Sequence, residues 1–69
     1  MTHEEFKAAR QALGLTQDET ATILGLDLRS VQRFETAPGA PTARKVNPTA
    51  ARVMRWMLAG YRPPEFPAR

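Results

Sequence analysis

The segment from Thr16 to Glu35 constrains the fold of this chain most, because it carries the start and stop signals of two short helices. Thr16 and Glu19 have the spacing of a capping box, in which each side chain bonds the backbone N–H of the other residue. Gly25 can adopt the left-handed conformation that ends a helix, and Asp27 is a good N-cap for the next one. We therefore predict helices at 17–24 and 28–36, set at a steep angle by the short turn between them.

The apolar residues of this segment indicate which side of the two helices is buried. They are Ala21, Leu24, Leu26, Val31 and Phe34. Position by position, the segment resembles the helix-turn-helix of the Cro and lambda-repressor family of bacterial and phage transcription regulators, with Gln17 opening the first helix and small residues at Ala21 and Gly25. Thr20 departs from the pattern, because a larger apolar residue is usual there. The resemblance implies an all-α, compact lambda-repressor-like DNA-binding domain of four or five helices.

Two further helices are predicted outside this segment. Thr2 and Glu5 form a second capping box, which starts a helix at 3–13 that stops at Gly14. Asn47 as N-cap and Pro48 at the first helical position begin a helix within 47–59, which Gly60 closes. The apolar stripes of these two helices consist of Phe6, Ala9 and Leu13, and of Ala50, Val53, Met54, Met57 and Leu58.

These elements divide the chain into a DNA-binding domain at 1–60 and a tail at 61–69. The domain contains the helix-turn-helix at 17–36 and a dimerisation helix at 47–59. Prolines at 63, 64 and 67 mark the tail, which we expect to be extended and packed only through Tyr61 and Phe66.

Length and composition exclude several classes of protein. A chain of 69 residues suffices for one domain, and without cysteine it has neither a disulfide framework nor a Cys-based zinc site. We find no apolar run of about 20 residues and no signal-peptide pattern, so we expect a cytoplasmic protein without a membrane span. A lone histidine, His3, and acidic pairs at helix starts make no catalytic set. We expect no enzyme activity, metal or cofactor.

Charge is distributed unevenly along the chain. Up to Asp27 two basic side chains accompany five acidic ones, whereas from Leu28 onward eight basic side chains accompany two acidic ones. Arginines that only solvate the surface would also give this pattern. Because the basic part starts at the second helix of the helix-turn-helix, however, a polyanionic partner is favoured.

The second helix of the motif is expected to enter the major groove of double-stranded DNA and to read base edges with its exposed first turns. The base-reading candidates are Leu28, Arg29, Gln32 and Arg33. Arg29 can donate to the O6 and N7 of guanine, and Gln32 can bond the N6 and N7 of adenine. Leu28 can meet a thymine methyl group or be a stray surface leucine, and Arg33 can read a base or hold a phosphate.

Phosphate contacts are expected from helix starts and from the loop after the second helix. Thr16 and Gln17 begin a helix, although Thr16 can also act only as a cap. Ser30 can donate to a phosphate or bond its own helix. Arg44 and Lys45 lie in the loop, which in the family runs along the DNA backbone.

The resemblance also implies a partly buried ion pair between Arg10 and Glu35, which links the first helix to the end of the third. Trp56 falls outside the main apolar stripe of the last helix, and tryptophan is enriched at protein contacts. We expect a homodimer with Trp56, Met57 and Tyr61 at the interface, although Trp56 could also be a plain core residue. Two-fold symmetry then places two reading helices about 34 Å apart and requires a palindromic operator.

The sequence therefore predicts a homodimeric transcriptional repressor of phage or mobile-element origin. It would bind a palindromic operator, exclude polymerase and regulate its own operon; the family includes regulators associated with anti-CRISPR genes. The alternative is an antitoxin-like or adaptor protein that binds a protein partner through its last helix and tail.

Overall fold

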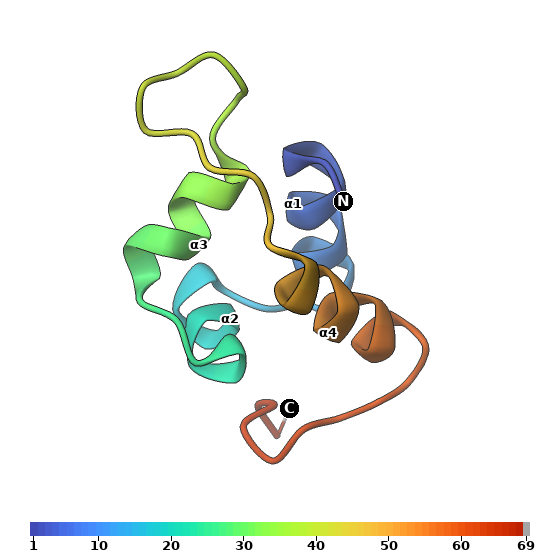
Figure 1. Cartoon of the computed structure of the whole chain (residues 1–69). Helices are drawn as coiled ribbons and strands as arrows, with labels where there is room; N and C mark the ends of the chain where they lie inside the picture. The colour runs from blue at the N-terminus through green and yellow to red at the C-terminus, as the bar shows by residue number, and fades with distance from the viewer. Residues whose placement is uncertain (69) are drawn as a thin grey trace.

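Four helices build the fold in a computed structural model that describes residues 1–68. They are α1 (His3–Ala12), α2 (Gln17–Leu24), α3 (Leu28–Glu35) and α4 (Pro48–Leu58). α1 packs against both α3 and α4, and α2 packs against α3. Figure 1 shows α3 at one edge of the molecule with α2 below it, and the loop that follows α3 extends beyond the helices. All regular structure in residues 1–68 is helical, so the predicted fold class is confirmed.

The helix starts follow the capping signals. In both predicted capping boxes the threonine hydroxyl accepts from the backbone N–H of the glutamate at 3.1 Å, for Thr2 with Glu5 and for Thr16 with Glu19. The Asn47 side chain accepts from the N–H of Ala50 at 2.7 Å and starts α4, with Pro48 as its first residue. Each of these bonds satisfies a backbone donor that the helix itself leaves unpaired.

The helix ends lie within one residue of the predicted positions. Gly25 ends α2 with a φ of 68°, the left-handed conformation in which other residues are strained. α3 ends at Glu35 because Thr36 is extended, and the Thr36 hydroxyl donates to the Gln32 carbonyl at 2.9 Å. α1 ends at Ala12 and α4 at Leu58, one residue earlier than expected.

The core lies where α1, α3 and α4 meet. Phe6 and Phe34 contact each other edge to face, with ring centroids 5.5 Å apart. The buried apolar side chains are Phe6, Ala9, Leu15, Ala21, Val31, Phe34, Ala50, Ala51, Met54 and Met57. Leu15 and Ala51 are members that the periodic stripes missed. Leu58 was expected in the core, but it is 49% exposed because it occupies the last position of α4.

Thr20, the residue that departs from the family pattern, is completely buried. Its hydroxyl donates to the carbonyl of Thr16 at 2.9 Å, so burying this polar atom leaves no donor unpaired. A threonine can therefore replace a larger apolar side chain here, because its polar group is satisfied inside its own helix.

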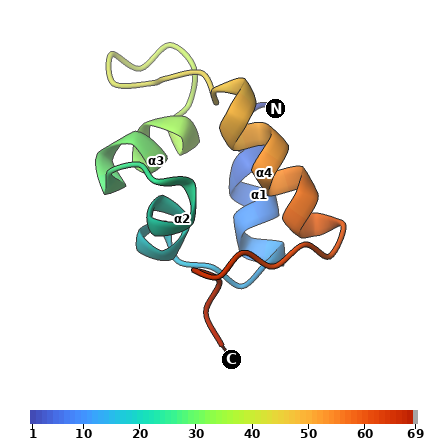
Figure 2. The ribbon, with the colours of Figure 1, turned by 60° about the horizontal axis from the view of Figure 1, so that its bottom comes forward.

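Residues 61–68 of the predicted tail pack more closely than expected, and Arg69 lies outside the described residues. Tyr61 is half exposed, whereas Pro63 is buried and Phe66 packs against the core. The Arg62 guanidinium donates to the Met57 carbonyl at 2.7 Å and lies 4.5 Å from the centre of the Phe66 ring. Figure 2 shows the tail returning from the end of α4 toward the connection between α1 and α2.

Candidate nucleic-acid interface

The two sides of α3 differ sharply in burial. Val31 and Phe34 are buried against the core, with 0% and 6% of their surface exposed. Arg29 and Gln32 are exposed on the other side, as expected for base-reading candidates. Leu28 and Arg33 are only partly exposed, which corrects the expectation that all four side chains are free. α3 therefore presents an arginine and a glutamine outward while its apolar side fixes the helix on the domain.

The first turn of α3 carries a bond that was not expected. Asp27 has the extended backbone of an N-cap, but its side chain makes no capping bond to the helix. Instead, the Ser30 hydroxyl donates to Oδ1 of Asp27. The hydrogen bond from this hydroxyl is the largest cause that lowers the pKa of the Asp27 carboxyl, and backbone hydrogen bonds lower it by a smaller amount. Ser30 thus donates its hydroxyl hydrogen bond to the Asp27 carboxylate in this structure, and its contact with a phosphate stays a prediction. The spacing of Asp27 and Ser30, three residues apart at the start of a helix, was the sequence signal that could have predicted this bond.

Arg10 and Glu35 lie at the centre of a network that joins three helices. Arg10 donates from Nε to Oε2 of Glu35 at 2.6 Å and from Nη2 to Oε1 at 3.0 Å. The two side chains are 14% and 5% exposed, respectively. Arg10 also donates to the Leu15 carbonyl at 2.9 Å, and Gln17 donates to Oε1 of Glu35 at 3.2 Å. The carboxylate at the end of α3 therefore connects to α1 and to the first residue of α2.

The two phosphate candidates at the start of α2 have different surroundings. Thr16 is exposed, and its hydroxyl accepts the capping bond from Glu19. A hydroxyl that accepts can still donate its own proton. Gln17 is partly buried, and its amide nitrogen bonds Glu35, a contact that sequence reasoning did not predict. The network thus fixes the orientation of the Gln17 side chain.

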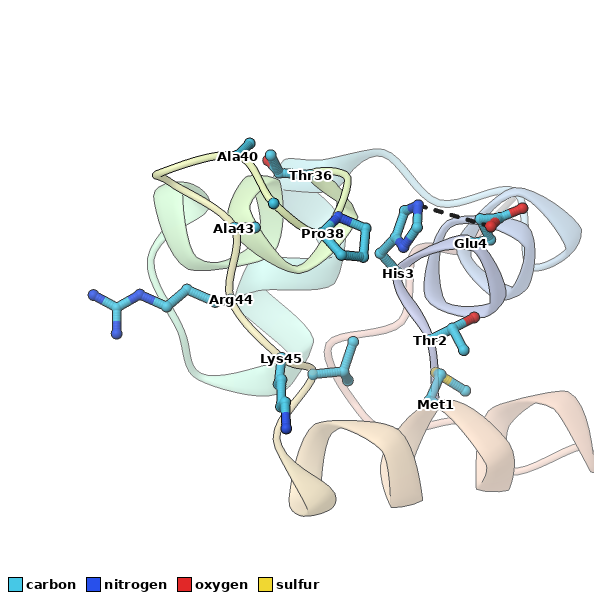
Figure 3. Close-up of a pocket in the computed structure, with 12 residues that line it drawn as sticks. Met1, Thr2, His3, Glu4, Thr36, Pro38, Ala40, Ala43, Arg44 and Lys45 are labelled. Carbon is cyan, nitrogen blue, oxygen red and sulfur yellow. Dashed lines mark ion pairs between the residues drawn. The ribbon is translucent and has the colours of Figure 1, made fainter.

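The two cations of the loop are exposed and lie after α3. The backbone N–H of Arg44 donates to the Arg33 carbonyl at 3.2 Å, which holds this part of the loop beside the end of α3. The loop and the start of α1 border a hollow of about 770 Å³, and Figure 3 shows the Arg44 side chain pointing away from it. Lys45, the next residue, is also exposed. The backbone bond thus holds the part of the loop that carries these two exposed cations beside the end of α3.

One aromatic residue of α4 and one of the tail form a separate exposed surface. Trp56 and Tyr61 are 52% and 50% exposed, and their rings contact each other edge to face at 6.2 Å. Met57, in contrast, is 0% exposed. The expectation that Met57 contributes to a dimer interface is therefore wrong, because its side chain is wholly used in the core of its own protomer.

Other kinds of site lack support in the part of the chain that the structure describes. Within residues 1–68, no three acidic, histidine or cysteine side chains gather as a metal site. Nε2 of His3 lies 3.9 Å from Oε1 of Glu4, an ion pair when His3 is protonated. None of the four helices is long and apolar enough to cross a lipid bilayer.

Comparison with known proteins gives one match. The sequence model of a family described as helix-turn-helix matches residues 6–47, more than half of the chain. The matched region runs from the core residue Phe6 through α2, α3 and the loop that carries Arg44 and Lys45. No curated protein and no solved structure matches the chain.

Proposed function

Because the chain belongs to the helix-turn-helix family of DNA-binding transcription regulators that resemble Cro and lambda repressor, we propose that it is a repressor that reads its operator with α3. The observation that carries this proposal is the outward pair of Arg29 and Gln32 on a helix whose opposite side is buried. In a major groove, Arg29 bonds guanine and Gln32 bonds adenine, and each pairing discriminates by roughly 1–3 kcal/mol.

Contacts to the DNA backbone come from both ends of the motif in this proposal. Thr16 and Gln17 lie at the start of α2, and Arg44 and Lys45 lie in the loop tied to the end of α3. Each phosphate neutralised by a cation releases counterions, so affinity falls by about 0.9 log unit per log unit of salt for each such contact. Repression needs no cofactor, because a protein that covers a promoter, including its own, excludes polymerase.

The test is selection of bound sequences from a random DNA pool, followed by fluorescence anisotropy on the selected site. Arg29→Ala should lose the preference at one base position by roughly tenfold, whereas Lys45→Ala should weaken binding to all sequences alike. Lys7→Ala removes one positive charge from the exposed side of α1 and serves as the matched control. Absence of any enriched sequence, or equal loss of specific and random binding in Arg29→Ala, would count against base reading by α3.

We further propose that the repressor is a homodimer joined through Trp56 and Tyr61. Two half-exposed aromatic rings in contact form an apolar surface of the kind that protein partners cover. A hollow of about 400 Å³ lies beside the indole and is lined by Pro48, Ala51 and Arg52 among others. A two-fold interface is self-complementary, so the indole of one copy can enter this hollow of the second copy.

Sedimentation velocity over a concentration series tests the dimer. Trp56→Ala should shift the protein toward monomer, whereas Leu58→Ala removes a similarly exposed apolar side chain from the opposite side of α4 and should leave the association unchanged. A wild-type protein that stays monomeric at high concentration, both free and with operator DNA, would exclude the homodimer.

A further inference from the structure

Asp27 occupies an unusual position for an acidic side chain. It is exposed at the entrance to α3, two residues before Arg29, on the helix that the proposed function places in a major groove. A carboxylate at such a place is repelled by the phosphates of DNA, a cost that a hydrogen bond from a base can offset. An N-cap aspartate ordinarily accepts a capping hydrogen bond from the first backbone N–H groups of its helix, but Asp27 makes no such capping bond, and the nearby backbone N–H groups lower its pKa less than the Ser30 hydroxyl does.

The Ser30 hydroxyl is the donor that Asp27 meets, and it bonds Oδ1 alone. An aspartate with the ordinary pKa of 3.8 is already ionised at neutral pH, and this bond lowers the pKa of Asp27 further. A carboxylate has about four lone-pair positions, and one hydroxyl occupies one of them. Ser30 thus fixes the orientation of the side chain and leaves it with acceptor capacity beyond the helix.

The donors available to this carboxylate in a major groove are few. Only the N4 amino group of cytosine and the N6 amino group of adenine present N–H bonds there. Adenine carries the N7 acceptor next to N6, which would repel the second oxygen of a carboxylate. Cytosine has no acceptor of its own on that edge, so it is the base that an ionised aspartate fits.

We infer that Asp27 is a base-reading residue that accepts a hydrogen bond from the N4 amino group of cytosine, with Ser30 as its positioning residue. This inference rests on the proposed function, because it requires α3 to lie in the major groove. It adds an acceptor to a reading surface in which Arg29 donates. Each half-site is then expected to contain a G·C pair at the position that Asp27 faces.

The experiment compares the full-length wild type with Asp27→Asn in random-pool selection, and then measures anisotropy on operators changed at one base pair at a time. The wild type should favour cytosine at one position by about tenfold. Asparagine bonds the N6 and N7 of adenine, so Asp27→Asn should change the preferred base at that position from cytosine to adenine and leave the other positions unchanged. Asparagine is also a good N-cap, and a thermal melt by circular dichroism checks that the variant folds.

Two further variants separate base reading from simple charge repulsion. Asp18→Asn removes another exposed carboxylate, from the first turn of α2, and should tighten binding to all sequences without changing any preference. Ser30→Ala should reduce the cytosine preference several-fold while the preferred base stays the same.

Uniform tightening in Asp27→Asn, with every base preference retained, would overturn the inference while the proposed repressor function stands. Absence of any sequence enrichment by the wild type would overturn the proposed function, and this inference with it.

Discussion

Replacing Glu35 with alanine should destabilise the domain strongly, because the carboxylate receives three hydrogen bonds from two helices. Arg10 donates two of them, at 2.6 and 3.0 Å, and Gln17 donates the third at 3.2 Å. The variant leaves the Arg10 guanidinium, only 14% exposed, without a counter-charge. Removing one partner of a buried ion pair costs about 3–5 kcal/mol, because the remaining charge is held away from water.

We take the lower end of this range, about 3 kcal/mol, because Arg10 keeps its bond to the Leu15 carbonyl and some contact with solvent. For a domain of this size, each kcal/mol lowers Tm by about 4–8 °C, so the expected fall is roughly 12–24 °C. The total free energy of unfolding at 69 residues is roughly 3–10 kcal/mol, so the variant loses about a third of its stability or more.

Thermal melts by circular dichroism measure this loss, and a second variant identifies its cause. Arg10→Met combined with Glu35→Leu removes both charges and keeps apolar volume, so it should recover most of the lost Tm. A double variant that melts as low as Glu35→Ala would mean that packing, not the unpaired charge, causes the loss. A Tm of Glu35→Ala within about 4 °C of the wild type would refute the reasoning altogether.

Three other changes should have smaller effects in the same assay. Thr20→Val keeps the buried shape and removes a hydroxyl whose partner, the Thr16 carbonyl, still accepts a backbone N–H, so the free energy of unfolding should change by less than about 1 kcal/mol. Gly25→Ala places a Cβ at a φ of 68° and should cost about 1–2 kcal/mol, seen as a lower Tm. Hydrogen bonds from Thr2 lower the pKa of Glu5 in the folded state below its ordinary 4.5. The unfolded chain therefore binds the proton more readily, and the stability from this carboxylate is present above pH 4.5 and is lost as the pH falls through the folded pKa. The difference in Tm between wild type and Glu5→Gln should accordingly shrink as the pH is lowered below 4.5, and a constant difference would contradict this sign.

The helix boundaries could be predicted closely because their signals are local. A capping box such as Thr16 with Glu19 involves backbone groups within one turn, and Gly25 acts through its own φ. Such signals do not depend on what packs against the helix. The outward side of α3 could also be predicted from a local signal, because the spacing of Val31 and Phe34 indicates which side of the helix is buried.

The errors concern contacts that depend on distant parts of the chain or on competing partners. Met57 was expected both in the apolar stripe of α4 and at the dimer interface, and the packing of α4 on α1 uses its side chain for the core alone. The tail was underestimated because the bond from Arg62 to the Met57 carbonyl closes a turn that no periodic pattern encodes. Asp27 was expected to cap α3, but the Ser30 hydroxyl competes with the backbone N–H groups for the same carboxylate.

The network around Glu35 also explains how so short a motif holds a defined reading surface. α2 and α3 have eight residues each, and the only buried apolar side chains that they carry are Ala21, Val31 and Phe34. Apolar packing of this kind is non-directional and tolerates small shifts of one helix against another. Hydrogen bonds are directional and do not tolerate such shifts. A single oxygen, Oε1 of Glu35, accepts from both Arg10 and Gln17, and it therefore fixes the end of α3 against the start of α2. In the proposed complex, α3 faces the bases and the start of α2 faces phosphates. Burying the Glu35 carboxylate costs desolvation energy. In return, the same carboxylate fixes the position of the base-reading helix relative to the residues that contact the DNA backbone.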